Sequence, residues 1–173
     1  MPCLFQFRDL NEFNAILKNK TWILTSLPPG KNLIGCTWVF KIKLHLSGAI
    51  ARHKARLVAQ GFSQQPGFDF NETFSPVVKP TTIRIVLSLA VSLGWQITHL
   101  DVNNVFLNGE LKEDIYMKQS LGFEWGGHLI CKLNKAIYGL KQASRAWFFT
   151  VHSVLLALGF SQSTADVLQT AEK

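Results

Sequence analysis

The chain has 173 residues, of which 47% are apolar and 17% are charged. This length suits one globular domain, and thirteen Phe, five Trp and two Tyr exclude a disordered chain, which would be charged and poor in aromatic residues. The net charge is +7, and no acidic residue lies between Glu12 and Asp69. A segment with one sign of charge either faces a polyanion or is a solvated surface, and both interpretations stay open.

The cysteines and the N-terminus bear on the location of the protein. Cys3, Cys36 and Cys131 lie far apart, and an odd number of cysteines cannot be fully paired within the chain. The N-terminus becomes charged too early for a secretory signal peptide. The uncharged stretch Ala146–Ala165 contains too many polar residues for a membrane span. We therefore expect an intracellular protein, cytoplasmic or nuclear, without a membrane partner.

The N-terminal half predicts a helix followed by a long hairpin. Apolar residues at helical spacing favour a short amphipathic helix over residues 8–20. Apolar residues alternate with the others over residues 38–46, which is the periodicity of a strand. Ser47-Gly48 is a turn signal, and the return strand is expected over Ile50–Ala59.

Basic residues recur at every second position of this hairpin. Arg52, Lys54 and Arg56 are two residues apart, so they share one face of the return strand, and Lys41 and Lys43 alternate on the first strand in the same way. The hairpin is expected to turn an apolar side toward a core and a basic side toward solvent or phosphate.

A helix and a short strand are expected after a long loop marked by proline and glycine. Thr81 or Thr82 is expected to cap the helix, and Gly94 is expected to close it. Its apolar stripe consists of Ile85, Val86, Leu89, Ala90 and Leu93. A short strand over Gln96–Val102 is expected to follow.

The C-terminal part predicts two further strands and a helix. The strands are expected over residues 114–118 and 128–133, on either side of a glycine-rich turn. A helix is expected over residues 140–158, with an inward stripe of Trp147, Phe148, Val151, Leu155 and Leu158. Strands and helices alternate without a regular βαβ order, so the predicted fold class is α+β.

Asp101 is the first candidate for chemistry, because it ends a predicted strand. Taken alone, an aspartate in this place is also a common turn or cap residue. A carboxylate at the end of a rigid strand is, however, a suitable ligand for Mg²⁺, which prefers oxygen ligands. A site for two metal ions about 4 Å apart needs more than one carboxylate.

The ordered motifs around Asp101 resemble the reverse transcriptase domain of copia-type retrotransposon polyproteins over roughly residues 8–166. The runs that carry the resemblance are NKTW (19–22), WVFK (38–41), RHKARLVAQGF (52–62), ETFSPV (72–77), TIR (82–84), LDVN (100–103), FLNG (106–109), YM (116–117), GF (122–123), CKL (131–133), YGLKQ (138–142), RAW (145–147) and GF (159–160). The resemblance implies a partial right-hand polymerase fold. Residues 8–80 would form the fingers, residues 81–166 part of the palm, and residues 167–173 an unmatched tail.

The resemblance also implies roles for individual residues. Asp101 would be the catalytic aspartate that binds metal, with Mg²⁺ as the cofactor. Phe106 would reject the ribose 2′-hydroxyl, although its residue type alone equally fits a core aromatic. The other implied nucleotide-binding residues are Lys54, Arg56, Tyr138, Gly139 and Lys141. The implied nucleic-acid-binding residues are Lys41, Lys43 and Arg52.

The implied activity is DNA synthesis on an RNA template, with a template-primer and deoxynucleoside triphosphates as partners. The sequence departs from the family in two places. Val105 stands where the family usually has alanine, and no adjacent pair of aspartates, as in the family's Tyr-x-Asp-Asp motif, occurs in the chain. We therefore expect a truncated reverse transcriptase that is inactive alone. A non-catalytic nucleic-acid-binding remnant is the alternative, and the sequence leaves the oligomeric state open.

Overall fold

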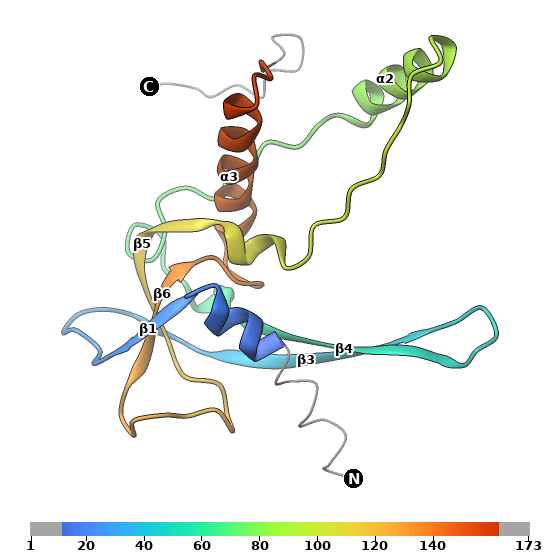
Figure 1. Ribbon diagram of the computed structural model, residues 1–173. Coiled ribbons are helices and arrows are strands. Elements are labelled where there is room, and N and C mark those ends of the chain that lie inside the picture. Colours follow the sequence, from blue (N-terminus) through green and yellow to red (C-terminus); the bar gives the residue numbers. More distant parts are fainter. Residues whose placement is uncertain (1–11, 163–173) are drawn as a thin grey trace.

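A computed structural model describes residues 12–162 of the chain (Figure 1). It combines a four-stranded sheet, a separate two-stranded hairpin and helices, which confirms the predicted mixture of helix and sheet. The predicted helix over residues 8–20 is present over residues 12–18, and its predicted first turn lies outside the described residues. Among the helices of this described part, none is long and apolar enough to cross a membrane.

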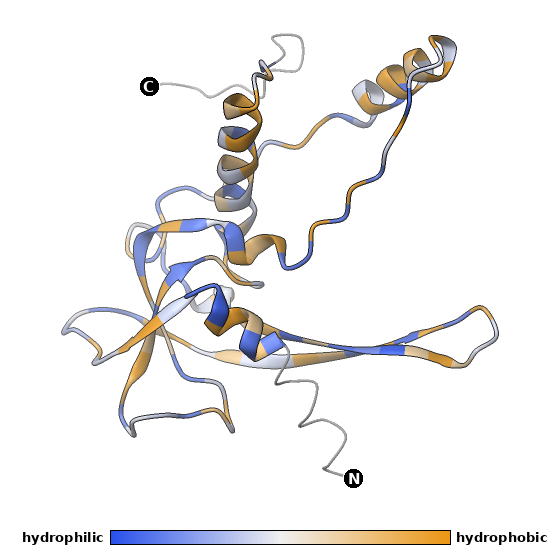
Figure 2. Ribbon diagram, viewed as in Figure 1, coloured by the Kyte–Doolittle hydropathy of each residue, from blue (hydrophilic) through white to orange (hydrophobic). Residues whose placement is uncertain are grey.

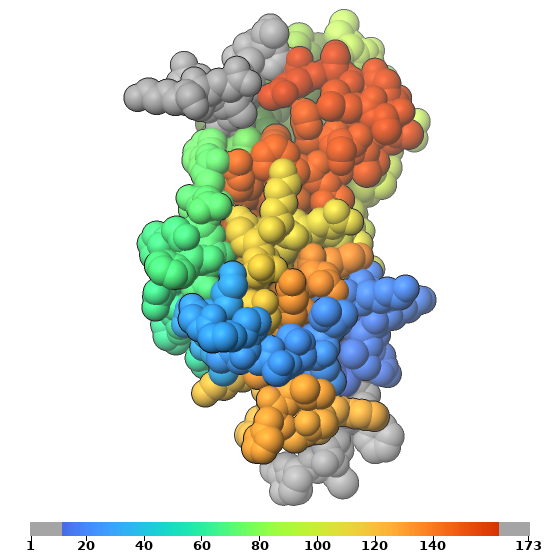
Figure 3. All heavy atoms as spheres, turned by 90° about the vertical axis from the view of Figure 1, so that its left-hand side faces the viewer, coloured from blue at the N-terminus to red at the C-terminus, as the bar shows by residue number. Residues whose placement is uncertain are grey.

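The four-stranded sheet joins segments from both ends of the chain. Its strand order is β1–β6–β5–β2, antiparallel except for the β2–β5 pair. The strands are β1 (Trp22–Thr25), β2 (Leu33–Ile34), β5 (Glu110–Met117) and β6 (Ile130–Lys135). The two strands predicted in the C-terminal part are therefore confirmed with shifted ends, whereas β1 and β2 were not predicted. Figure 3 shows the early and late segments packed side by side.

The hydrophobic core lies around this sheet. Ile34, Ile115, Met117 and Leu133 are buried strand residues, and Ile137 of the following loop is buried with them.

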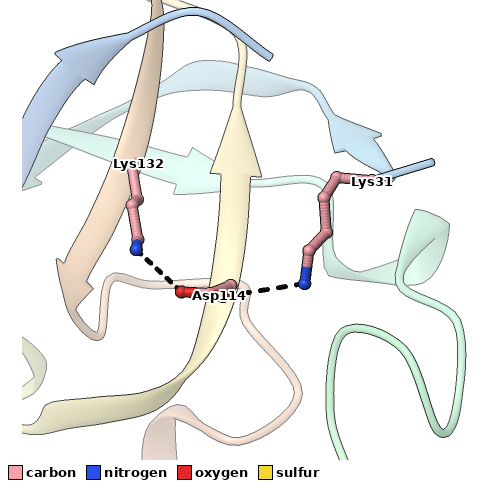
Figure 4. Close-up of polar contacts among 3 residues, drawn as sticks. All are labelled: Lys31, Asp114 and Lys132. Carbon is pink, nitrogen blue, oxygen red and sulfur yellow. Dashed lines mark ion pairs between the residues drawn. The ribbon is translucent and has the colours of Figure 1, made fainter. Parts of the chain in front are cut away.

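On the outer surface, Asp114 of β5 lies between two lysines (Figure 4). Its carboxylate oxygens are 2.8 Å from Lys132 Nζ and 3.6 Å from Lys31 Nζ. The hydrogen bond and charge of Lys132 hold the pKa of the Asp114 carboxyl below its ordinary value.

The predicted hairpin is confirmed, with strands β3 (Cys36–Leu44) and β4 (Ile50–Ala59). Figure 1 shows it projecting far from the body. The expectation that its apolar side faces a core holds only at the base, where Leu57 and Ala59 are buried. Ile42, further out, is 54% exposed. The outer part of the hairpin therefore extends past the core.

Helix α2 (Pro80–Ser92) is confirmed, but its predicted cap and buried stripe are wrong. Lys79 is the N-cap, and Pro80 occupies the first helical turn, where its missing N–H costs no hydrogen bond. Gly94 follows the helix with φ +65°, as expected of a closing glycine. Ala90 is the only buried residue of the helix. Two extended segments hold α2 away from the body (Figures 1 and 2). Most of its apolar side chains are exposed, Ile85 and Leu89 among them.

The predicted strand Gln96–Val102 is wrong. The segment has no regular secondary structure, and all its residues are exposed. Leu100 is 82% exposed and Val102 is 46% exposed. A strand requires a neighbour that accepts and donates its backbone hydrogen bonds, and within residues 12–162 no strand pairs with this segment.

Helix α3 (Ala143–Ala157) begins three residues later than predicted. Its first half packs against the short helix η2 (Val105–Asn108) and against β5. Trp147, Phe148 and Val151 are half-buried, as the predicted stripe requires. Leu155 and Leu158 are exposed, which corrects the prediction for the second half. That half rises above the sheet, where the described residues provide no cover (Figure 1).

Candidate nucleotide and nucleic-acid site

The hairpin gathers cations on one face. Lys41 pairs directly with Lys54 across the strands, and Lys43 pairs with Arg52. Arg56 lies two residues beyond Lys54 on the same face of β4. Desolvation and the charges of Arg56, Arg52 and Lys43 lower the pKa of Lys54. Loss of solvation is the largest of these causes and the neighbouring charges follow; a bound anion would oppose both, because it favours the charged form of Lys54.

Three of the predicted nucleotide-binding residues form a stack at the base of the hairpin. The guanidinium carbon of Arg56 lies 4.6 Å from the centre of the Tyr138 ring. The Phe106 ring meets Tyr138 edge to face, with centroids 4.8 Å apart. The Nε of Arg56 is buried and has no hydrogen-bond partner among the described residues. An unpaired buried donor of Arg56 therefore lies beside the Tyr138 ring among the described residues.

Phe106 also fits its alternative interpretation, that of a core aromatic. It is half-buried and packs against the hydrophobic core. Asn104, just before η2, has φ +51°, a left-handed conformation that Asn adopts more readily than most residues. This turn brings Phe106 from the exposed segment 95–103 onto Tyr138. The ring is thus at once a core residue and a neighbour of the Arg56–Tyr138 stack.

The turn that carries Tyr138 and Gly139 is fixed against the end of β4. The Ala59 N–H donates to the Tyr138 carbonyl oxygen at 2.8 Å. Gly139 has φ +89°, and a Cβ there would collide with the Ala59 carbonyl oxygen. A Cβ on Gly61 would collide with the Gly139 carbonyl oxygen. Two glycines therefore allow the turn and the end of β4 to approach backbone to backbone.

The structure does not bring all the predicted residues into this stack. The Lys141 ammonium is 3.4 Å from the Gln64 carbonyl oxygen and 4.8 Å from the centre of the Phe70 ring, so it turns toward the segment after β4. Asp101 lies in the exposed segment without regular structure. Within residues 12–162, no three His, Cys, Asp or Glu side chains gather where they could hold a metal ion.

Sequence reasoning missed two features of this site. The half-buried Glu12 carboxylate contacts the Asn104 side chain and faces the charges of Arg56 and Lys54. Burial raises the pKa of Glu12, and these three neighbours partly offset the rise. Gln64 and Gln142 are buried and hydrogen-bonded to each other. The sequence offers no signal for the glutamines, because their contact joins segments 78 residues apart.

A groove of about 590 Å³ lies elsewhere, between the loop at residues 71–72, β5 and α3. None of the predicted site residues lines it. Inside it, Arg145 forms an ion pair with Glu72 at 2.7 Å and donates to the Phe74 carbonyl oxygen at 3.1 Å. These contacts tie the loop to α3, which gives Arg145 and Glu72 a structural role.

The family model described as "Reverse transcriptase (RNA-dependent DNA polymerase)" matches residues 19–168. The chain is 50% identical over 159 residues to the "Retrovirus-related Pol polyprotein from transposon RE1" of Arabidopsis thaliana. The alignment covers 90% of this chain and 11% of that protein. It is 48% identical over 157 residues to the corresponding polyprotein from transposon TNT 1-94 of Nicotiana tabacum, with 90% and 12% covered.

A more distant relative is the "Transposon Ty1-ER2 Gag-Pol polyprotein" of Saccharomyces cerevisiae, 31% identical over 156 residues, with 84% of this chain and 8% of that protein covered. The chain thus spans only a small part of the length of the curated relatives that it matches. No solved structure matches it significantly. The relatives confirm the resemblance to copia-type polyproteins that the sequence motifs indicate.

Proposed function

Because the chain belongs to the reverse transcriptase (RNA-dependent DNA polymerase) family, we propose that it is the nucleotide-binding and template-binding part of a retrotransposon Pol polyprotein. In this proposal residues 8–80 correspond to the fingers and residues 81–166 to the first part of the palm of a right-hand polymerase. DNA synthesis on an RNA template is the activity proposed for the whole polyprotein. The 173-residue chain is proposed to bind the substrates without joining them.

The observation that carries the proposal is the position of Arg56. Its guanidinium lies over Tyr138, next to Lys54 on the same strand face, and its buried Nε lacks a partner among residues 12–162. Guanidinium and ammonium groups form short, charge-assisted hydrogen bonds with phosphate. We assign the triphosphate of an incoming deoxynucleotide to Lys54 and Arg56, and its sugar to the side of Tyr138 where Phe106 lies. There the bulk of Phe106 would exclude a ribose 2′-hydroxyl.

The described residues do not fit the metal ions that this family generally uses. Magnesium binds through carboxylates together with phosphates and water, and a two-ion site needs several carboxylates close together. Asp101 is exposed on a segment that no described strand pairs with. No metal-dependent step is therefore assigned to this chain.

Titration with dTTP tests the nucleotide site. Lys54→Ala and Arg56→Ala are each expected to weaken binding about tenfold or more, because a hydrogen bond to a charged group contributes roughly 1.5–3 kcal/mol. Arg84→Ala, which removes an exposed cation of α2, is the matched control and should leave the dissociation constant unchanged. Equal affinities for all four proteins would contradict the assignment of the triphosphate to β4.

The outer part of the hairpin favours a second function, the binding of a nucleic-acid strand. Lys41, Lys43 and Arg52 are exposed there, on the face that also carries Lys54. Phosphate contacts of this kind bind nucleic acid without regard to sequence. The second function requires no metal and no catalysis, and it corresponds to the alternative of a non-catalytic binding remnant.

Affinity for single-stranded RNA should therefore fall steeply with salt. Replacing Lys41, Lys43 and Arg52 together with alanine should lower the log–log salt slope by about two units, because each phosphate contact on a single strand contributes about 0.7. The matched control replaces Lys18, Arg84 and Lys112, three exposed cations outside the hairpin. If the control lowers the slope as much as the hairpin variant, the binding is a property of net charge and not of this face.

A further inference from the structure

A chain of buried amide groups lies behind the turn that carries Tyr138. Gln64, in the loop after β4, is 3% exposed, and Gln142, just before α3, is 2% exposed. Gln64 Oε1 accepts the Lys141 backbone N–H at 2.9 Å, and Gln64 Nε2 donates to Gln142 Oε1 at 3.0 Å. One side chain thus holds two consecutive residues at the end of the turn.

The chain of hydrogen bonds continues beyond Gln142. Gln142 Nε2 donates to the Asp69 carbonyl oxygen at 3.0 Å. The Asp69 carboxylate accepts from Asn32 Nδ2 at 2.6 Å and from the Gln65 backbone N–H at 2.8 Å. The nitrogen and the oxygen of each glutamine amide both have a partner, so the orientation of both amides is fixed. A buried network paired in this way favours one arrangement, because a flipped amide would leave a buried group unpaired.

The turn is therefore held at two points. At its start, the Tyr138 carbonyl oxygen accepts from the Ala59 N–H at the end of β4. At its end, the Lys141 N–H donates to Gln64. Gly139 lies between these points with φ +89°. Glycine has no side chain that could help to hold this conformation. Loss of the second point would leave the turn with a single backbone hydrogen bond to β4, the one at the Tyr138 carbonyl oxygen.

We infer that Gln64 is a positioning residue for the nucleotide site, which sets the Tyr138–Lys141 turn against the nucleoside while Lys54 and Arg56 take the phosphates. The inference rests on the proposed function and adds a residue that neither the motifs nor the relatives assign. The backbone that carries Lys54 and Arg56 is held by the pairing of β4 with β3, which does not involve Gln64. Substitution of Gln64 should therefore weaken contacts with the nucleoside and leave contacts with the triphosphate unchanged.

The test measures dissociation constants of the full chain for dTTP and for inorganic tripolyphosphate. Gln64→Met keeps the length of the side chain and removes both hydrogen bonds. It should weaken dTTP binding about tenfold or more and tripolyphosphate binding less than about threefold, because only the groups of the turn lose their partner. Gln65→Met, one residue along and exposed, is the matched control and should change neither constant.

The other outcomes are distinct. Equal weakening of both ligands would make Gln64 merely structural, and no change would deny it any role; both results overturn the inference and leave the phosphate site standing. A wild-type chain that binds dTTP no better than tripolyphosphate would overturn it as well, since the nucleoside would not contact the turn. If the wild-type chain binds neither ligand, the proposed function fails too.

Amide hydrogen exchange of the wild-type chain provides a second measurement in case Gln64→Met does not fold. The Lys141 amide should exchange slowly, and dTTP should slow the Gly139 and Lys141 amides further, whereas tripolyphosphate should not. A Lys141 amide that exchanges as fast as those of the exposed segment 95–103 would show that Gln64 does not hold the turn, and would overturn the inference without any variant.

Discussion

Gly139→Ala is expected to lower the free energy of unfolding by about 3–5 kcal/mol, a large part of the stability of a small domain. Two costs add. The alanine must adopt φ +89°, which costs roughly 1–2 kcal/mol for a residue with a Cβ. Its Cβ also collides with the Ala59 carbonyl oxygen and lies 2.7 Å from a methyl group of Val58, so the turn must move away from β4. Urea unfolding followed by tryptophan fluorescence measures the loss.

Two other glycines separate these costs. Gly48 has φ +81° in the hairpin turn, with nothing within 4 Å of an added Cβ, so Gly48→Ala should cost only the conformational part. Gly61 has no positive φ, but its added Cβ would collide with the Gly139 carbonyl oxygen, so Gly61→Ala should cost only the steric part. If Gly139→Ala costs no more than Gly48→Ala, the turn and β4 do not approach as closely as described.

Local patterns of the sequence predicted the local structure well. The bounds of β4 agree with the prediction residue for residue, because strand alternation and the Ser47-Gly48 turn are both short-range signals. Helices α2 and α3 follow from their helical spacing in the same way. The strands β1 and β2 escaped prediction because they are short, and their partners β6 and β5 lie more than 80 residues away in the sequence.

The errors concern burial, which depends on what covers a face. The stripe of α2 and the segment Gln96–Val102 have the apolar pattern of buried elements, yet apart from Ala90 they are exposed among the described residues. A pattern shows which face prefers to be buried and does not supply the partner. The C-terminal end of α3 likewise lacks a covering partner among the described residues, and Leu158, which caps it, is 69% exposed.

The residues of the candidate site also differ in how far they could be predicted. Residue spacing alone placed Arg52, Lys54 and Arg56 on one face. The family resemblance named Tyr138, which the structure brings onto Arg56, and Phe106, which it brings onto Tyr138. Gln64 and Glu12 could not be predicted. Their partners come from distant segments, and a buried glutamine has no residue pattern that distinguishes it from the exposed Gln65 beside it.

We propose that this chain holds a nucleotide and does not join it to a primer. The 173 residues contain no adjacent pair of aspartates, and the resemblance assigns one metal-binding carboxylate, Asp101. A two-ion reaction needs several carboxylates, and the loss of one electrostatic stabiliser alone slows catalysis by about 10²–10³.

Primer extension on an RNA template tests this claim most directly, with all four deoxynucleotides and with Mg²⁺ or Mn²⁺. The purified chain should leave the labelled primer unextended with either ion. Extension that disappears in Asp101→Asn and persists in the control Asp114→Asn, which alters a surface ion pair of β5, would contradict the account, because the missing metal ligands would then lie within this chain.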